Sequence, residues 1–385
     1  MSTGLVAELK AHAAALGLDR VGVADARPFE AEREALLARA AGPGLNPYEH
    51  QDIADRVEPD RLLPGVKAIV AVAMSYAMPE PPDGTDPETL TGWLSMYCRG
   101  LDYHQLLEER MGALAAWIEA RVPGSRSYVH VDIGPPLDRA VAMRAGLGKF
   151  GKSTLLITPG LGTWTFLGEV YTTAALPPDE PLAFNPCGTC TRCLDACPTG
   201  ALTEWSLDWT RCLGYVNQMD GAVPLEYREV MGDRLFGCDD CQTVCPYNRA
   251  AATGLHPEYA PLPGIGARPD LVGLMNLDEP AFDALYGPTA AAWRGLEAVQ
   301  RNALVALGNT GRAEAIAPLT EALAHDRPLL RRHAAWGLGR LAGLVPAVAA
   351  EAQRALLHRQ TLESDPDVAH ELELALAMIP VPAQG

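Results

Sequence analysis

The first part of the chain alternates apolar segments of strand length with helical patterns. Val66–Ala77 is an almost unbroken apolar run, which is typical of a buried strand. Shorter segments also have the composition or alternation of strands: Tyr128–Ile133, which stops at a Gly-Pro-Pro bend, Leu155–Thr158 and Thr163–Tyr171. Leu137–Ala145 has the apolar spacing of a helix. The pattern predicts an N-terminal α/β domain over residues 1–180.

From about residue 281 onward the chain has only helical patterns, and they repeat. The segment RNALVALG at Arg301–Gly308 matches RHAAWGLG at Arg332–Gly339, and we place a weaker third copy around Val368–Met378. Repeats of this length stack as helical pairs with a concave face. We therefore predict HEAT-like helical repeats over residues 281–385, after a linker over residues 256–280. An ordinary helical bundle is the alternative.

The segment between these regions, residues 181–255, contains eight of the nine cysteines. They follow one pattern: Cys187-x2-Cys190-x2-Cys193-x3-Cys197-Pro198, then Cys212, then Cys238-x2-Cys241-x3-Cys245-Pro246. Eight thiolates match two [4Fe–4S] clusters, and in two-cluster ferredoxins the Cys before Pro binds the other cluster. We therefore predict a ferredoxin-like domain with two ligand sets. One is Cys187, Cys190, Cys193 and Cys245, and the other is Cys197, Cys212, Cys238 and Cys241.

Zinc and disulfides fit this cysteine pattern less well. Zinc sites pair C-x2-C motifs without a further Cys next to Pro, and disulfide frameworks belong to short secreted chains. Leu5–Leu16 has the pattern of an amphipathic helix and not that of a signal peptide. No apolar segment approaches the length of a membrane span. We expect a cytoplasmic protein with no membrane contact.

The size and charge of the chain limit its domain count and the kinds of partner it can bind. The 385 residues suggest two or three domains, and 48% hydrophobic residues suffice for real cores. A net charge of -17 argues against broad, nonspecific nucleic-acid binding, although it leaves room for a local basic patch.

A phosphate-binding loop is suggested by Gly146–Ser153, which fits G-x-x-x-x-G-K-[ST]. That motif requires a strand before it and a helix after it. Here a helical pattern precedes it and a strand-like segment follows. The sequence therefore disfavours an ATPase, and we expect these glycines to let the backbone approach another bulky ligand.

Several motifs outside the cysteines occur in a fixed order: RGLDYH at Arg99–His104, VDIGP at Val131–Pro135, DRA at Asp138–Ala140, AGLGKFGKST at Ala145–Thr154, LGE at Leu167–Glu169 and GCDDCQ at Gly237–Gln242. This set resembles the epoxyqueuosine reductase family from the N-terminus to about residue 250, and the helical tail matches a common form of it. Two departures are Lys149-Phe150, where the family usually has Trp and an aliphatic residue, and Asp138, where Glu is commoner.

The resemblance implies an α+β protein with a cobalamin-binding α/β domain, a two-cluster ferredoxin-like domain and HEAT-like repeats. It also implies cobalamin and two [4Fe–4S] clusters as cofactors. The implied reaction converts epoxyqueuosine to queuosine at the wobble position of tRNA. The implied partners are tRNA carrying epoxyqueuosine and a flavodoxin- or ferredoxin-type reductant protein. We expect a monomer.

Asp132 is the candidate proton donor for this reaction. It ends a predicted strand beside a bend, and burial against an apolar corrin face would raise its pKa. The alternative is that Asp132 caps the helix starting near Leu137. Asp138 and Arg139 have the character of a helix start, and we give them no role in the chemistry.

The resemblance also places residues near the cobalamin. These are Arg56, Cys98, Asp132, Ser153, Thr154, Leu167, Gln218, Asp239 and Gln242. Cys98, the ninth cysteine, is equally explained as a small buried residue. Tyr103 and His104 either face the same cavity or are polar core residues.

The helical repeats are the candidate tRNA-facing region because arginines gather there: Arg294, Arg301, Arg312, Arg327, Arg331, Arg332 and Arg340. The alternative is that these arginines lie on solvated helix faces.

Two other functions would use the same iron–sulfur pattern. A corrinoid reductive dehalogenase would act on a small molecule and have no tRNA surface. A plain electron carrier would need neither a pocket acid nor a large α/β domain, yet nearly half of this chain forms one.

Overall fold

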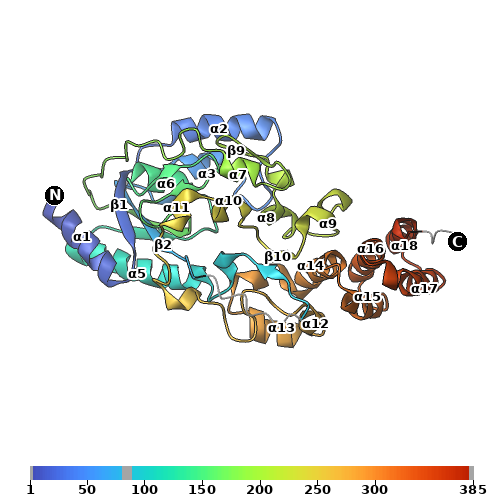
Figure 1. Cartoon of the computed structure of the whole chain (residues 1–385). Helices are drawn as coiled ribbons and strands as arrows, with labels where there is room; N and C mark the ends of the chain where they lie inside the picture. Colours follow the sequence, from blue (N-terminus) through green and yellow to red (C-terminus); the bar gives the residue numbers. More distant parts are fainter. Residues whose placement is uncertain (1–2, 80–88, 381–385) are drawn as a thin grey trace. The chain divides into compact units, whose positions relative to one another are not determined.

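The computed structural model describes residues 3–79 and 89–380, which form two compact units (Figure 1). The first unit comprises residues 3–79, 102–210 and 240–259. The second comprises residues 89–101, 211–239 and 260–380. Each unit draws on separate stretches of the chain. The domain boundaries expected at residues 180, 255 and 280 stay a prediction.

The first unit is built on a four-stranded sheet in the order β1-β2-β7-β4. Its strands are β1 (Arg20–Asp25), β2 (Ala68–Ser75), β7 (Thr165–Thr172) and β4 (Ser127–His130). All neighbouring strands pair antiparallel. The apolar runs predicted as strands therefore form the sheet. The strand expected over residues 128–133 already ends at His130, because the backbone turns at Asp132 with a φ of 54°.

Helices cover both faces of this sheet, which explains the continuous apolar sequence of β2. Ile69, Ala71 and Ala73 share one core with α6 (Asp138–Arg144) and with residues of α2 (Glu30–Ala41) and α3 (Ile53–Val57). On the other side, α5 (Tyr103–Arg121) packs on β4 and β7, and α1 (Thr3–Ala15) packs on β1 and α5 (Figure 1). Every residue of β2 is buried as a result.

The glycine-rich segment forms a hairpin and not a phosphate-binding loop. Its strands are β5 (Lys149–Phe150) and β6 (Leu156–Ile157), which follow α6. A Cβ atom at Gly148 would lie 2.6 Å from the Ile157 carbonyl oxygen. At this glycine, the expectation that a ligand requires the close approach is wrong, because the partner strand does.

The other α-helices and strands of the first unit are short: α4 (Pro59–Leu62), α7 (Arg192–Asp195), β8 (Leu202–Thr203), β9 (Ser206–Leu207), α10 (Asp240–Thr243) and α11 (Pro246–Arg249). The cysteine-rich segments of this unit therefore have little regular structure, as a metal-centred core predicts.

The second unit contains the helical repeats. Its main helices are α14 (Gly295–Asn309), α15 (Ile316–Ala322), α16 (Pro328–Leu344), α17 (Ala349–Gln360) and α18 (Pro366–Met378). Helix α16 packs between α14 and α18. The three sequence copies thus fall on α14, α16 and α18, which confirms the repeat.

The other elements of the second unit precede or support the repeats. They are α8 (Leu213–Val216), α9 (Leu225–Met231), α12 (Leu271–Met275), α13 (Glu279–Tyr286) and a parallel pair of strands, β3 (Trp93–Leu94) and β10 (Arg234–Phe236). Among the residues that the structure describes, we find no helix with the length and apolar character needed to cross a membrane.

Candidate active site and cluster-binding cysteines

Asp132 lies at the tip of a strained turn that follows β4. Its φ is 54°, a value uncommon for a residue other than glycine, and the Ile133 N–H donates to the Val131 carbonyl at 2.6 Å. About half of the Asp132 side chain (54%) is exposed. The helix that follows begins after Leu137 with no side-chain cap, so the alternative role of Asp132 as a helix cap is excluded. Strain of this kind is typical of functional residues.

The start of α5 brings two polar side chains to the Asp132 carboxylate. The Tyr103 hydroxyl donates to Asp132 Oδ2 at 2.8 Å, and His104 Nε2 lies 3.3 Å from the same oxygen. Tyr103 is fixed by stacking on Phe166, with ring centroids 4.0 Å apart. On its other side, His104 Nδ1 lies 2.7 Å from Asp102 Oδ1. The imidazole therefore bridges two carboxylates.

These contacts determine which of the two side chains, His104 or Asp132, carries a proton. Burial lowers the pKa of His104, but the hydrogen bonds to Asp102 and Asp132 outweigh it and raise that pKa to about 9. Burial raises the pKa of Asp132, but the hydrogen bonds from His104 and Tyr103 outweigh it and lower that pKa. The expected raised pKa of Asp132 is therefore wrong for this structure. At neutral pH the proton resides on His104.

Asp102 is the residue of this site that the sequence pattern did not assign. Its carboxylate accepts from the backbone N–H of His104, which caps α5, and it also orients the His104 ring. The available signal was an Asp immediately before a helical pattern, which predicts a cap.

The first predicted set of cluster ligands lies within the first unit. The thiol pKa of Cys193 is raised by burial and by the nearby charges of Cys187 and Cys245. The thiol pKa of Cys245 is raised by burial and by Cys187 and Cys190. The four sulfurs therefore lie close enough to influence one another. A set of four half-buried, unbridged thiols fits a [4Fe–4S] cluster.

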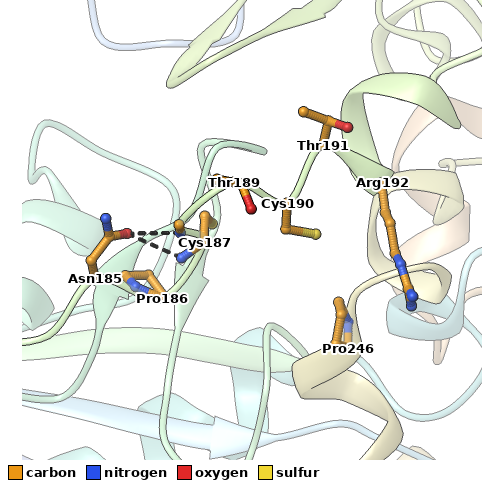
Figure 2. A pocket seen from close by; sticks show the side chains of 9 residues that line it. Asn185, Pro186, Cys187, Thr189, Cys190, Thr191, Arg192 and Pro246 are labelled. Carbon is orange, nitrogen blue, oxygen red and sulfur yellow. Dashed lines mark hydrogen bonds between the residues drawn. The ribbon is translucent and has the colours of Figure 1, made fainter.

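Backbone and amide groups shape the loop that carries two of these thiols. Asn185 Oδ1 accepts from the backbone N–H of Cys187 at 3.2 Å and of Gly188 at 3.1 Å (Figure 2). The Lys152 N–H points at Cys187 Sγ at 3.3 Å. A pocket beside this loop is lined by Asn185, Pro186, Cys187, Gly188, Thr189, Cys190, Thr191, Arg192 and Pro246 (Figure 2).

The second predicted set has two thiols in each unit, and it stays a prediction from the sequence. In the first unit, burial raises the pKa of Cys197, but hydrogen bonds from Thr199 and from backbone N–H groups outweigh it and lower that pKa. This thiol is thus prepared to be a thiolate ligand. In the second unit, a Cβ at Gly214 would lie 3.6 Å from Cys212 Sγ and 3.9 Å from the backbone nitrogen of Cys238.

Besides Asp132, five residues predicted near cobalamin lie in the first unit: Arg56, Ser153, Thr154, Leu167 and Gln242. Arg56 Nη1 donates to Glu49 at 2.5 Å, whereas its Nε is buried with no partner in the part of the chain that the structure describes. Gln242 Oε1 accepts from the Tyr76 hydroxyl at 3.2 Å and from Thr163 Oγ1 at 2.9 Å. An unsatisfied Arg donor fits a ligand rich in amide oxygens, such as cobalamin.

Three others, Cys98, Gln218 and Asp239, lie in the second unit. Asp239 is buried and accepts from Ser95 Oγ at 2.7 Å and from the Met96 N–H at 2.8 Å. It thereby fixes the segment that carries Cys98. The Cys98 thiol is buried, donates to the Ser95 carbonyl at 3.1 Å, and has a pKa raised by that burial. This matches the description of Cys98 as a small buried residue.

The arginines of the repeat region bind groups within their own unit. Arg331 donates to Glu363 at 2.8 Å and 2.9 Å, and Arg332 donates to Glu371 at 2.9 Å. Arg301 is buried and donates to three backbone carbonyls, those of Asn217, Met219 and Gly221. Arg301 and Arg331 are therefore structural, and the hypothesis that they face tRNA is wrong because both side chains are buried.

Comparison with known proteins gives the family. Three family models match: "4Fe-4S double cluster binding domain" over residues 186–248, "Epoxyqueuosine reductase QueG, DUF1730" over residues 56–132 and "HEAT repeats" over residues 294–377. Epoxyqueuosine reductases of Bacillus cereus and Bacillus subtilis are each 37% identical to this chain, and each alignment covers 96% of both chains. The chain belongs to the epoxyqueuosine reductase family.

Solved structures of this family also have the same fold. A crystal structure of epoxyqueuosine reductase with an epoxyqueuosine-modified tRNA-Tyr stem loop has a TM-score of 0.91 at 36% identity and covers 98% of this chain and 99% of its own. A Bacillus subtilis structure, with a TM-score of 0.90 at 35% identity and the same coverage, shows its catalytic aspartate loop swung out of the active site.

Membership of the epoxyqueuosine reductase family confirms several predictions at once. The chain is an enzyme, an epoxide-reducing oxidoreductase, and its cofactors are two [4Fe–4S] clusters and cobalamin. The α+β architecture with HEAT-like repeats is confirmed as well.

Proposed function

We propose that this chain reduces epoxyqueuosine to queuosine at the wobble position of tRNA, with Asp132 passing a proton to the departing epoxide oxygen. The observation that carries the role of Asp132 is its position on a strained turn, half exposed and hydrogen-bonded to Tyr103 and His104. An exposed carboxylate with a proton donor 3.3 Å behind it suits acid catalysis on a large substrate.

The reaction requires two electrons and two protons, and the oxygen leaves as water. Cobalamin, when bound, supplies the reducing electron pair, which the clusters deliver one electron at a time. The chain must supply protons because an alkoxide is a poor leaving group. Substrate that covers the half-exposed Asp132 removes water from it and raises its pKa. The proton of His104 then moves to Asp132 and from there to the oxygen.

The assignment of ligands to each cluster is part of this proposal. Cys187, Cys190, Cys193 and Cys245 bind one cluster, and Cys197, Cys212, Cys238 and Cys241 bind the other. The mutual influence of the first four thiols supports the first set. The cysteine pattern and the double-cluster family model support the second.

The cobalamin contacts are proposed on the resemblance, with support from single residues. The proposed contacts are Arg56, Cys98, Asp132, Ser153, Thr154, Leu167, Gln218, Asp239 and Gln242. Arg56 Nε is buried and has no hydrogen-bond partner among the described residues, which supports the contact by Arg56. We further propose a monomer in the cytoplasm that receives electrons from a flavodoxin- or ferredoxin-type protein.

Replacement of the acid tests this function directly. The Asp132→Asn variant keeps the shape of the side chain but cannot release a proton. We expect its cluster and cobalamin absorption to match the wild type, while turnover of epoxyqueuosine-containing tRNA falls by about 100-fold or more. The matched control is Asp283→Asn on the exposed surface of α13, which should turn over normally. Near-normal turnover by Asp132→Asn would overturn the role of Asp132.

A further inference from the structure

Three titratable side chains converge beside the loop that carries Asp132. His130 ends β4, Glu169 lies opposite it on β7, and Asp138 begins α6. One ligating atom of each side chain lies within 4.8 Å of the other two, and His130 Nε2 is 3.3 Å from Asp138 Oδ1. We call these three residues the acid–histidine cluster.

Two residues of the acid–histidine cluster are buried and the third, Asp138, is half-buried. Glu169 is completely buried, and His130 is 3% exposed. Both Glu169 oxygens, His130 Nε2 and Asp138 Oδ1 are buried without a hydrogen bond from any described residue. Four such atoms facing one another indicate that something positively charged or proton-bearing belongs among them.

Electrostatics requires a compensating charge at this place. Two carboxylates this close, one of them completely buried, resist being ionised together without such a charge. Burial raises the pKa of Glu169 well above its ordinary value, and the charges of Asp138 and Asp132 raise it further. The other titratable groups facing the cluster are Tyr171, whose pKa is raised by burial and Glu169, and Arg139, which interacts with Asp138.

The imidazole of His130 connects the acids to the Asp132 loop. Its Nε2 faces Asp138, whereas a Cβ atom at Gly134 would lie 3.1 Å from its Nδ1. The two ring nitrogens therefore face different groups, one the acids and the other the loop. His130 also lies close enough to the Asp132 carboxylate to interact with it electrostatically.

We infer that the acid–histidine cluster is a buried proton store that recharges Asp132 during the reaction. This inference rests on the proposed function, which needs two protons per turnover. His104 supplies the first through Asp132. Glu169 then loses its proton to His130, and His130 passes one to the Asp132 carboxylate from its other nitrogen. The Asp138 side chain, which is 24% exposed, returns a proton from water to Glu169.

A shared proton accounts for this cluster without a divalent metal ion. The three residues could also hold an ion that completes its coordination with water, and the test below distinguishes the two. One shared proton removes the conflict between the two carboxylates without further ligands.

The test uses Glu169→Gln in the reconstituted holoenzyme. The amide has the same shape but cannot release a proton. The matched control is Thr172→Val, which removes another buried polar group from the same strand. We expect Glu169→Gln to lose a protonated-carboxyl C=O band from the infrared spectrum. Its single-turnover rate at pH 8 should fall by about tenfold or more and recover when an imidazole buffer is added. Thr172→Val should change neither property.

Asp138→Asn serves as a second variant in case Glu169→Gln fails to fold, and we expect a similar rate loss with recovery in imidazole. An unchanged rate across pH, or a rate loss that imidazole does not relieve, would overturn the proton store. A divalent metal found by elemental analysis in the wild type, beyond iron and cobalt, and lost in Glu169→Gln would do so as well. If Asp132→Asn turns over normally, the proposed function itself fails. If only the Glu169→Gln results fail, that function stands.

Discussion

At the scale of single residues, the chemistry depends on protonation, and neighbours decide protonation. Asp132 is recognisable from the VDIGP motif, but its ionised state follows from the hydrogen bonds made by Tyr103 and His104. The proposed acid of this site is therefore the pair of Asp132 and His104, with the proton on the imidazole at rest. A prediction that treated Asp132 alone expected the opposite state.

The pairing of Asp132 with His104 makes both the stability of the fold and the reaction rate depend on pH. The folded pKa of His104, about 9, lies above its ordinary value of 6.5. The protonated His104 side chain therefore stabilises the folded state fully below about pH 6.5, and this stabilisation is lost as pH rises through about 9. We expect wild-type single-turnover rates to hold at neutral pH and to fall above about pH 9.

Replacement of the imidazole should move that loss to lower pH. In His104→Gln, Asp132 has no proton source behind it, so we expect a rate at pH 8 about tenfold or more below wild type, with partial recovery toward pH 6. His370→Gln, an exposed histidine on α18, is the control and should follow the wild-type profile. Identical pH profiles for His104→Gln and wild type would show that His104 does not supply the proton.

At the scale of secondary-structure elements, close helix packing explains part of the repeat pattern. The glycine that ends the first copy, Gly308 on α14, lies against Gly337 on α16, and a Cβ at Gly308 would be 2.7 Å from the Gly337 Cα. At the end of the second copy, Gly339 meets Ala375 of α18 in the same way, at 2.9 Å from its Cα. Small residues thus recur in the sequence where helices cross.

The Gly308→Ala variant tests this packing. The added methyl group meets backbone, which cannot rotate away, so we expect a loss of about 1–3 kcal/mol in the free energy of unfolding, measured by denaturant titration. Gly343→Ala, at an exposed position of α16, is the control, since the atom nearest to the added Cβ would be 3.8 Å away. It should be neutral or stabilising by about 1 kcal/mol because alanine favours helix. Equal effects of the two variants would contradict the close-packing explanation.

At the scale of the whole molecule, residues far apart in sequence must meet. Cys245 is proposed to complete a cluster whose other ligands begin at Cys187, and Arg228 of α9 binds Glu371 of α18. In each case several helices or strands separate the two segments along the chain. The proposed Cys245 ligand bears on the iron content of the protein, and the Arg228–Glu371 ion pair bears on its stability.

Removal of the distant thiol should affect one cluster. We expect Cys245→Ala to lower the iron content of the reconstituted protein from about eight toward about four atoms per chain. Cys98→Ala is the control, because Cys98 is not in either ligand set, and it should retain about eight. An unchanged iron content in Cys245→Ala would remove Cys245 from the ligand set.

Loss of the Glu371 charge should destabilise the second unit. Arg228 donates to Glu371 at 2.8 Å and 3.2 Å, and both side chains are at most 1% exposed. We expect Glu371→Gln to lose about 3–5 kcal/mol of unfolding free energy because the buried Arg228 guanidinium no longer faces a negative charge. Glu373→Gln, 68% exposed on the same helix, should change stability by less than about 0.5 kcal/mol. A loss in Glu371→Gln no larger than in this control would contradict the prediction.

The sequence alone determined the features that depend on local chemistry or on spacing. Four features are recognisable from periodicity, thiol spacing or motif order alone: the apolar run of β2, the repeat of α14 and α16, the eight clustered cysteines and the candidate acid Asp132. Tertiary structure decided what depends on neighbours brought from elsewhere in the sequence. It fixed the antiparallel order of the sheet, the burial of Arg301 and Arg331, the proton on His104 and the meeting of His130, Asp138 and Glu169. The protonation and the burial of a side chain depend on the residues packed around it, and folding brings those residues together from distant parts of the chain.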